Sequence, residues 1–92
     1  MADYDDARLQ VVRALEEMEQ TAGTALMLDD RETRTESWCW VFFYNSRAYI
    51  EDGNEIEALA GNGPIVVEKA TGRMHALTAA YPVEDQLARL MP

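Results

Sequence analysis

Apolar residues recur every three or four positions along residues 3–20, and this spacing predicts an N-terminal helix with one apolar stripe. The stripe consists of Tyr4, Ala7, Val11, Leu15, Met18 and Ala22. Aspartates at positions 3, 5 and 6 stand where the helix dipole favours negative charge, and Gly23 is placed to end the helix. We therefore expect a helix that packs its stripe against a sheet.

After Gly23 the pattern changes to short apolar runs, which are typical of strands. Residues 25–28 predict a short buried strand, and the polar residues 29–36 predict an exposed turn that makes a hairpin with the next run. Residues 38–44 are apolar at every position, which predicts a central strand covered on both faces and continuing to Ile50. The N-terminal helix would cover one face of this strand. Since only one more helix is available, we expect some aromatic surface on the other face to stay exposed.

An acidic connection separates this strand from a second pair of strands. Residues 51–57 form the most acidic short segment, and Ile56, Ala58, Leu59 and Ala60 predict one helical turn ended by Gly61. Pro64 is compatible with a strand start or an edge, residues 65–67 continue as a strand, and an Ala-Thr-Gly turn leads into a returning strand over residues 73–77.

The last element is a short C-terminal helix. Pro82 suits its first position, acidic residues follow in the first turn, and its buried side is predicted to be Val83, Leu87 and Leu90. The order of a helix, four strands and a helix predicts one α+β domain over residues 1–92. In this domain the N-terminal helix packs on a four-stranded antiparallel sheet.

Charge narrows the classes of partner. Among 92 residues, 17 are acidic and 8 are basic, so the formal net charge is −9. Nucleic acid and anionic membranes would be repelled, because both are bound by neutralising phosphates with lysine and arginine. A partner protein with a basic surface would instead be attracted. The alternative is that the charge serves only to keep the protein soluble.

Two features of the composition bear on the compartment. No stretch approaches the roughly 20 apolar residues of a membrane span, and the acidic N-terminus does not look like a signal peptide. The single cysteine, Cys39, cannot form an internal disulfide, which fits a reducing compartment. We expect a cytoplasmic protein.

Catalysis has one candidate constellation in the sequence. Cys39 with His75 as base and Asn62 would make a thiol hydrolase. However, Cys39 stands between two tryptophans in a predicted strand, whereas reactive cysteines favour electropositive, partly exposed places. We therefore predict no catalytic residue.

Metal and cofactor motifs are missing from the sequence as well. It has no CxxC or HExxH, and its Asp-Gly-Asn-Glu run at 52–55 does not have EF-hand spacing. The Gly-Asn-Gly at 61–63 precedes a predicted strand rather than a helix, so we interpret it as a turn and not as a phosphate loop. We predict neither a metal site nor a cofactor.

What remains is a predicted partner-binding surface. Arg47 and Tyr49 alternate along the far end of the predicted central strand, next to the acidic segment, and together they combine an aromatic anchor with charge. The predicted partner-binding residues are Arg47, Tyr49, Glu51, Asp52, Glu55 and Glu57. The alternative is that Tyr49 and Ile50 simply pack in the core.

The sequence also resembles a known family. The likeness covers about half of the chain, from Trp38 to Leu87, and its most specific pieces are Leu-Ala-Gly-Asn-Gly-Pro at 59–64, the Thr-Gly turn at 71–72 with His75 and Leu77, and Pro82 with its acidic followers. These motifs resemble the YrhB-type domain, or immunity protein 35 family, of bacterial toxin-immunity loci. Where the family usually has Leu-Gly-Thr-Ala, this chain has Leu-Thr-Ala-Ala at 77–80, so the local backbone there is expected to differ.

The resemblance implies a function that the residues alone do not. Members of this family are small cytoplasmic antidotes, encoded beside secreted polymorphic toxins, that bind the toxin and block it without enzymatic activity. The expected partner is thus a cognate toxin, and the resemblance transfers no contact residue. The alternative is a chaperone-like protein that binds apolar segments of clients through spare aromatic surface. An unpaired edge strand would also allow a homodimer.

Overall fold

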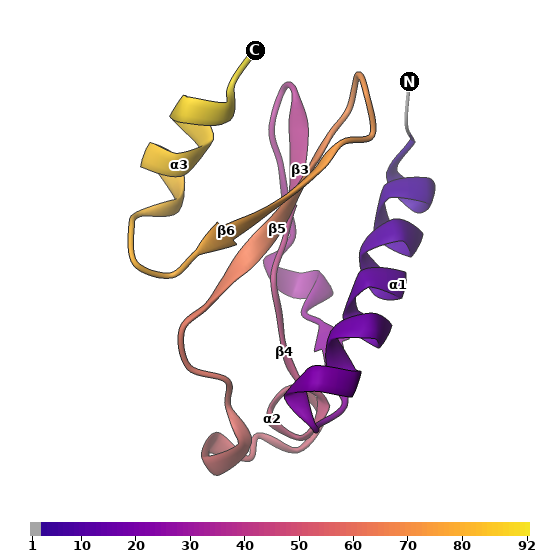
Figure 1. The fold of residues 1–92 in the computed structure, drawn as a ribbon, viewed down its shortest axis with the longest axis vertical. Helices are drawn as coiled ribbons and strands as arrows, with labels where there is room; N and C mark the ends of the chain where they lie inside the picture. The colour runs from indigo at the N-terminus through magenta and orange to yellow at the C-terminus, as the bar shows by residue number, and fades with distance from the viewer. Residues whose placement is uncertain (1–2) are drawn as a thin grey trace.

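The computed structural model of the protein describes residues 3–92 and shows helices on both sides of antiparallel strands (Figure 1). In chain order the elements are α1 (Tyr4–Ala22), β1 (Leu26–Leu28), the 3-10 turn η1 (Asp30–Glu32), β2 (Arg34–Thr35), β3 (Cys39–Phe42), β4 (Tyr44–Ser46), α2 (Arg47–Asp52), the 3-10 turn η2 (Glu55–Glu57), β5 (Asn62–Glu68), β6 (Met74–Thr78) and α3 (Val83–Leu90). The α+β class, the N-terminal helix and the short C-terminal helix are confirmed.

The strands form two sheets rather than the single sheet that was predicted. Four strands pair in the order β2-β3-β5-β6, and β1 pairs with β4 in a separate two-stranded sheet. The predicted antiparallel pairing of residues 25–28 with the next apolar run is confirmed only at the far end of that run: β1 pairs with Tyr44–Ser46, whereas Cys39–Phe42 pairs with β2 and β5. The outer place beside β3 is taken by β2, which lies in the stretch expected to be an exposed turn.

Helix α1 forms where the apolar spacing predicts it, and both of its ends are capped. At its start the side chain of Asp3 accepts a hydrogen bond from the Asp6 N–H at 2.8 Å. At its end Gly23 has a φ of 71°, a left-handed conformation that costs glycine little. Ala7, Val11 and Leu15 are buried against β1, β3 and β5, so the predicted packing of the stripe on strands is confirmed for these positions.

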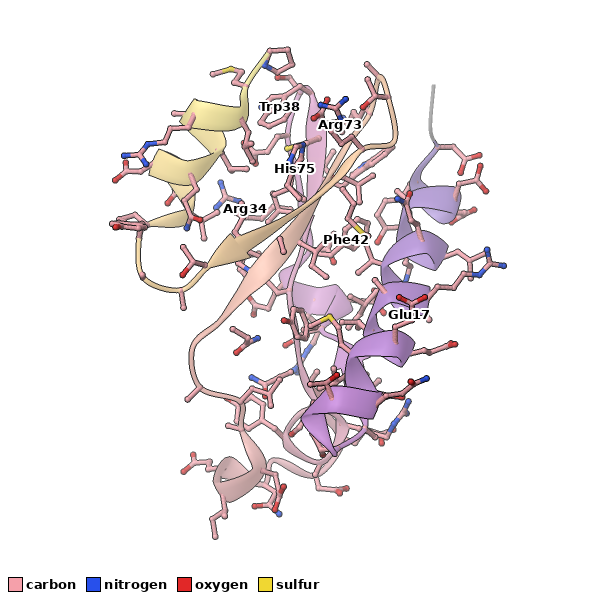
Figure 2. The ribbon with its side chains drawn as sticks, in the orientation of Figure 1. Glu17, Arg34, Trp38, Phe42, Arg73 and His75 are labelled. Atoms are coloured by element: carbon pink, nitrogen blue, oxygen red, sulfur yellow. The ribbon has the colours of Figure 1, made fainter. Side chains whose placement is uncertain are left out.

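The four-stranded sheet has a packed core on each face. Trp40 and Phe42 of β3 point toward α1, whereas Cys39 and Val41 point the other way, toward Leu87 of α3. Figure 2 shows Phe42 between the sheet and α1. This alternation is what a strand covered on both faces requires.

The second face is covered more completely than the sequence indicated. Helix α3 lies over it, with Leu87 buried and with Trp38 and Phe43 packed around the same cluster. None of the aromatic side chains of residues 38–44 is exposed. Trp38, Phe43 and Tyr44 are only half-buried, so the expectation that some aromatic surface stays accessible is confirmed in part.

A bulge near the start of β5 explains the Gly-Pro pair there. The register between β5 and β6 shifts between Asn62 and Ile65, so that Gly63 and Pro64 together oppose Leu77. A Cβ on Gly63 would lie 2.1 Å from the Leu77 carbonyl oxygen, so only glycine allows this approach of the two backbones. Pro64 is buried beside it and brings no N–H that would need a partner.

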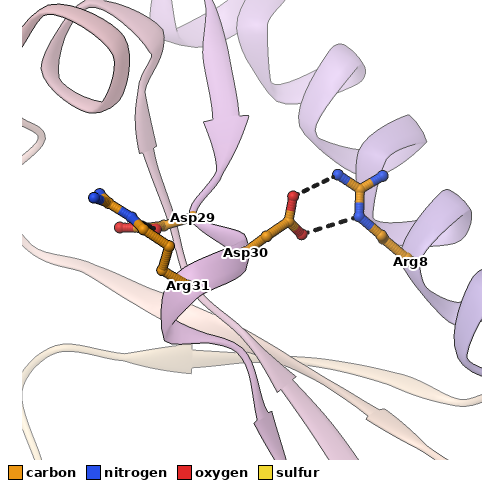
Figure 3. A network of polar contacts seen from close by, with 4 residues as sticks. All are labelled: Arg8, Asp29, Asp30 and Arg31. Carbon is orange, nitrogen blue, oxygen red and sulfur yellow. Dashed lines mark hydrogen bonds and ion pairs between the residues drawn. The ribbon is translucent and has the colours of Figure 1, made fainter.

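One bidentate ion pair ties α1 to the connection between the two sheets. Arg8 Nε and Nη2 donate to the two carboxylate oxygens of Asp30 at 3.0 and 2.8 Å, while Arg31 pairs with Asp29 at 3.2 Å on the far side of the same turn (Figure 3). The hydrogen bond from Arg8 lowers the pKa of Asp30. Both partners of the Arg8–Asp30 pair are about half exposed, so the pair adds little to the stability of the fold. Its main role is to fix the orientation of η1 relative to α1.

Candidate functional site

The predicted partner-binding residues lie on a helix and a turn, not on a strand. Strand β4 ends at Ser46, and α2 begins at Arg47, so the predicted continuation of the central strand to Ile50 is wrong. The reason is local: the buried Ser46 hydroxyl accepts the Tyr49 N–H at 3.1 Å and caps the helix. A serine followed seven residues later by Gly53, whose φ is 68°, was the cap signal that the sequence offered.

The chain then makes a second, tighter turn. The Asn54 side chain accepts the Ile56 N–H at 3.2 Å and opens the 3-10 turn Glu55–Glu57. The helical turn that was expected just before Gly61 therefore lies upstream, and residues 58–60 are not helical. We call residues 47–57 the acidic loop.

Buried or half-buried polar side chains fasten the acidic loop at both ends. Asn45 Oδ1 accepts hydrogen bonds from the N–H groups of Ser46 and Leu59, at 2.8 and 2.7 Å, and so joins the start of the loop to its end. Asn62 Nδ2 donates to the Tyr44 carbonyl oxygen at 2.9 Å and so makes a second link between the two ends, outside the first. These asparagines hold the loop as a closed unit, and sequence reasoning gave neither of them that role.

All six predicted partner-binding residues are exposed. Arg47 forms an i,i+4 ion pair with Glu51 at 3.7 Å, and both side chains stay about half exposed. Tyr49 is 38% exposed and so does not pack as the alternative supposed, whereas Ile50 is half-buried. The remaining three acidic residues lie at the end of α2 (Asp52) and in η2 (Glu55 and Glu57).

Sequence reasoning missed the most exposed large apolar side chain of the loop. Ile56 is 93% exposed and stands between exposed Glu55 and Glu57. The signal was present as a single β-branched residue between two glutamates, but it was assigned to a helical turn. Ile56 is thus a single exposed apolar side chain between two acidic ones, in a segment of two short capped turns.

The acidic loop lies at one end of the molecule. In Figure 1 the start of α1, α3 and the C-terminus lie toward one end of the long axis, while α2 and the turn that follows it lie at the other. The loop is therefore clear of the packed faces of the four-stranded sheet, so a partner could cover it without disturbing either core.

The thiol-hydrolase alternative finds no support in the geometry. Cys39 is fully buried, and burial raises the pKa of its thiol to about 11, so it stays protonated. The His75 ring lies 2.6 Å from a Glu68 carboxylate oxygen (Nε2 to Oε2), a contact that lowers the pKa of Glu68; Figure 2 labels His75. Asn62 is engaged with Tyr44, as described above.

Two further features, a metal site and a membrane-spanning helix, are not found in the described residues. Within residues 3–92, no three histidine, cysteine or acidic side chains are gathered closely enough to hold a metal ion. None of the helices in the same part of the chain has both the length and the apolar content needed to cross a membrane.

Comparison with known proteins places the chain in a family. Residues 5–89 match the model of the family described as immunity protein 35. The chain belongs to the immunity protein 35 family. The match covers α1 and reaches into α3, whereas the motifs recognised in the sequence began only at Trp38.

A curated relative agrees with this assignment. The protein described as uncharacterized protein YrhB, from Escherichia coli (strain K12), is 40% identical over 48 residues, which cover 52% of this chain and 51% of YrhB. The chain thus matches about half the length of this relative. No solved structure matches the chain.

Proposed function

We propose that this protein is a non-catalytic immunity protein that binds a cognate polymorphic toxin and blocks it, with the acidic loop as the contact surface. Membership of the immunity protein 35 family supports an immunity role in general. The choice of surface rests on one observation: Ile56 is 93% exposed within an acidic border.

The acidic loop combines exposed apolar side chains, which can be buried by a partner, with acidic side chains, which attract a basic surface. Large side chains that become fully desolvated at the centre of an interface supply most of the binding energy, and Ile56 and Tyr49 are available for that role. The acidic side chains around them attract a basic surface and speed its association at low salt. A toxin with a basic active-site rim and an apolar pocket fits this arrangement.

Blocking by occlusion needs no chemistry from the immunity protein. The loop is held as a closed unit by Asn45 and Asn62, so little ordering entropy is lost on binding. The cytoplasm, where such a protein would shield its own cell, is the compartment we propose.

The first experiment is binding to the toxin encoded by the adjacent gene, measured by calorimetry with purified proteins. We expect a complex, with Ile56→Ser weakening it at least about tenfold. Leu9→Ser is the matched control, because Leu9 is also a large exposed apolar residue but lies on α1, and it should bind like the native protein.

The two possible failures are distinct. Absence of a complex at micromolar concentration would overturn the proposed function. A complex that Ile56→Ser leaves unchanged would keep the function and overturn the assigned surface. Replacing Glu55 and Glu57 together by glutamine should slow association at low salt and reduce its dependence on ionic strength, since these carboxylates supply the steering.

A further inference from the structure

Strand β6 is one of the two edge strands of the four-stranded sheet, opposite the two-residue β2. The Glu68 N–H donates to the Arg73 carbonyl oxygen at 2.9 Å, and in an antiparallel pair bonded residues alternate with non-bonded ones. With Val66 opposite His75, the alternation makes His75 a bonded residue. The backbone N–H and C=O groups of Met74 and Ala76 therefore point away from β5, toward open space.

The next residue on β6 whose backbone groups face outward is Thr78, and its N–H and C=O are already hydrogen-bonded. The Gln86 side chain accepts the Thr78 N–H at 3.0 Å and donates to the Thr78 carbonyl oxygen at 2.8 Å. Its amide thus takes the place that a neighbouring strand would fill, and it closes the edge at Thr78. The backbone N–H and C=O groups of Met74 and Ala76 are left for pairing. An extended backbone laid along the edge can hydrogen-bond to all of them.

A groove of about 380 Å³ runs beside this edge, between β6 and α3. Its wall includes His75, Leu77, Tyr81, Arg89 and Leu90. Tyr81 is 61% exposed, and Arg89 forms no ion pair within residues 3–92. The groove is therefore largely apolar, with one available cation.

We propose that β6 and this groove bind an extended segment of a partner protein, which pairs antiparallel with Met74 and Ala76. In an added strand, the residues opposite His75 and Leu77 point to the same side as these two side chains, into the groove. The lining selects an apolar side chain opposite Leu77 and a carboxylate opposite His75, within reach of Arg89. Backbone pairing supplies affinity, and the alternate side chains supply specificity.

A second copy of the chain is a poor occupant. One two-fold register would satisfy all four free groups, pairing Met74 of each copy with Ala76 of the other. That register places Arg73 of the other copy opposite Leu77, so a second cation would enter a groove that already holds Arg89. Each copy also carries a net charge of −9. Charge thus disfavours the homodimer that an edge strand allows in principle.

This site is separate from the acidic loop and does not rest on the proposed function. In Figure 1 α3 lies near the end that carries the start of α1 and the C-terminus, far from α2. A toxin bound at the acidic loop would leave the β6 edge open. A failure at either site leaves the other untouched.

The test uses a designed probe, the blocked peptide acetyl-Thr-Leu-Thr-Glu-Thr-amide, titrated into the isotope-labelled protein and followed by NMR. Aligned antiparallel, its leucine faces Leu77 and its glutamate faces His75. We expect the amides of Met74 and Ala76 to shift and to become protected from hydrogen exchange. The dissociation constant of so short a peptide should be on the order of 1 mM.

Two control peptides separate pairing from general attraction. Methylating the backbone nitrogens of the third and fifth residues removes the donors to Ala76 and Met74, and should weaken binding at least about tenfold. The peptide acetyl-Thr-Leu-Glu-Thr-Thr-amide has the same composition but places its two large side chains on opposite faces, and should weaken binding similarly. Both controls leave the protein unchanged, so they do not depend on the folding of a variant.

Two protein variants test the named groups. Ala76→Pro removes an N–H that faces away from β5, which an edge strand tolerates, and should abolish binding. Arg89→Gln should remove the preference for glutamate over glutamine in the peptide. The proposal is overturned if the native peptide shifts neither Met74 nor Ala76, if the methylated peptide binds equally, or if these amides become protected on raising the protein concentration without peptide, which would show self-pairing.

Discussion

The four-stranded sheet and the acidic loop are ordered in different ways, the sheet by burial of apolar side chains and the loop by hydrogen bonds. In the sheet, Phe42, Val41, Val66 and Val67 are fully buried, and both faces are covered by helices. In the acidic loop no residue is buried, and order comes from caps and two asparagine links at its ends.

The two regions differ in how far burial accounts for their side chains. Burial explains why the sheet residues are apolar and leaves nothing further to account for. It does not explain Ile56, which remains in water in the free protein although its exposure contributes nothing to folding. The contrast makes the loop, rather than the tryptophan-rich strand, the surface to examine for a partner.

The largest expected effect comes from opening the sheet's core. Phe42→Ala removes a fully buried ring between the sheet and α1, and should cost about 3–5 kcal/mol of unfolding free energy through lost burial and a cavity. Urea denaturation followed by tryptophan fluorescence measures it. Tyr81→Ala, which removes an exposed aromatic ring, should cost far less; equal losses would mean that burial of the Phe42 ring does not account for the effect.

A pair of glycines compares the two regions directly. Gly63→Ala places a Cβ against the Leu77 carbonyl oxygen and should cost about 2–3 kcal/mol, because two paired backbones must separate. Gly53→Ala in the loop meets no atom within 4 Å, and only its φ of 68° is unfavourable, so about 1 kcal/mol is expected. Thermal unfolding of both variants checks the order, and a larger loss for Gly53→Ala would contradict it.

The join between the regions should show an intermediate effect. Ser46→Ala removes the cap of α2 and should cost about 1 kcal/mol. Because the cap holds the Tyr49 N–H, hydrogen exchange at the Tyr49 amide should accelerate. The relative exchange rates of the amides in β3 and β5 should stay as they are in the native protein. Ser37→Ala, an exposed serine outside any cap, serves as control. Unchanged exchange at Tyr49 would show that the asparagine links alone order the loop.

The smallest effect on stability belongs to the residue with the largest proposed effect on binding. Ile56→Ser should change the unfolding free energy by less than about 0.5 kcal/mol, because the side chain is already in water. Urea denaturation tests this. A loss above 1 kcal/mol would show that Ile56 supports the fold, and its exposure would then not mark an interface.

Local patterns were sufficient where an element carries its own signals. Helix α1 was predicted from its spacing and from Gly23, and the β5–β6 hairpin from its Thr-Gly turn. Helix α3 was also found, although Pro82 is its cap and not its first residue. For the candidate site, the sequence located the acidic segment, but it assigned Arg47 and Tyr49 to a strand and passed over Ile56.

By itself, then, the sequence determined the class of the fold, the strong negative charge and the elements whose spacing and caps lie within a few residues of one another. Only the tertiary structure decided which strands pair, that α3 covers the second face, and which side chains remain in water. The physical reason is that pairing and burial depend on surfaces contributed by distant segments. β1 is a strand because β4 reaches it, and Ile56 is exposed because no such surface reaches it.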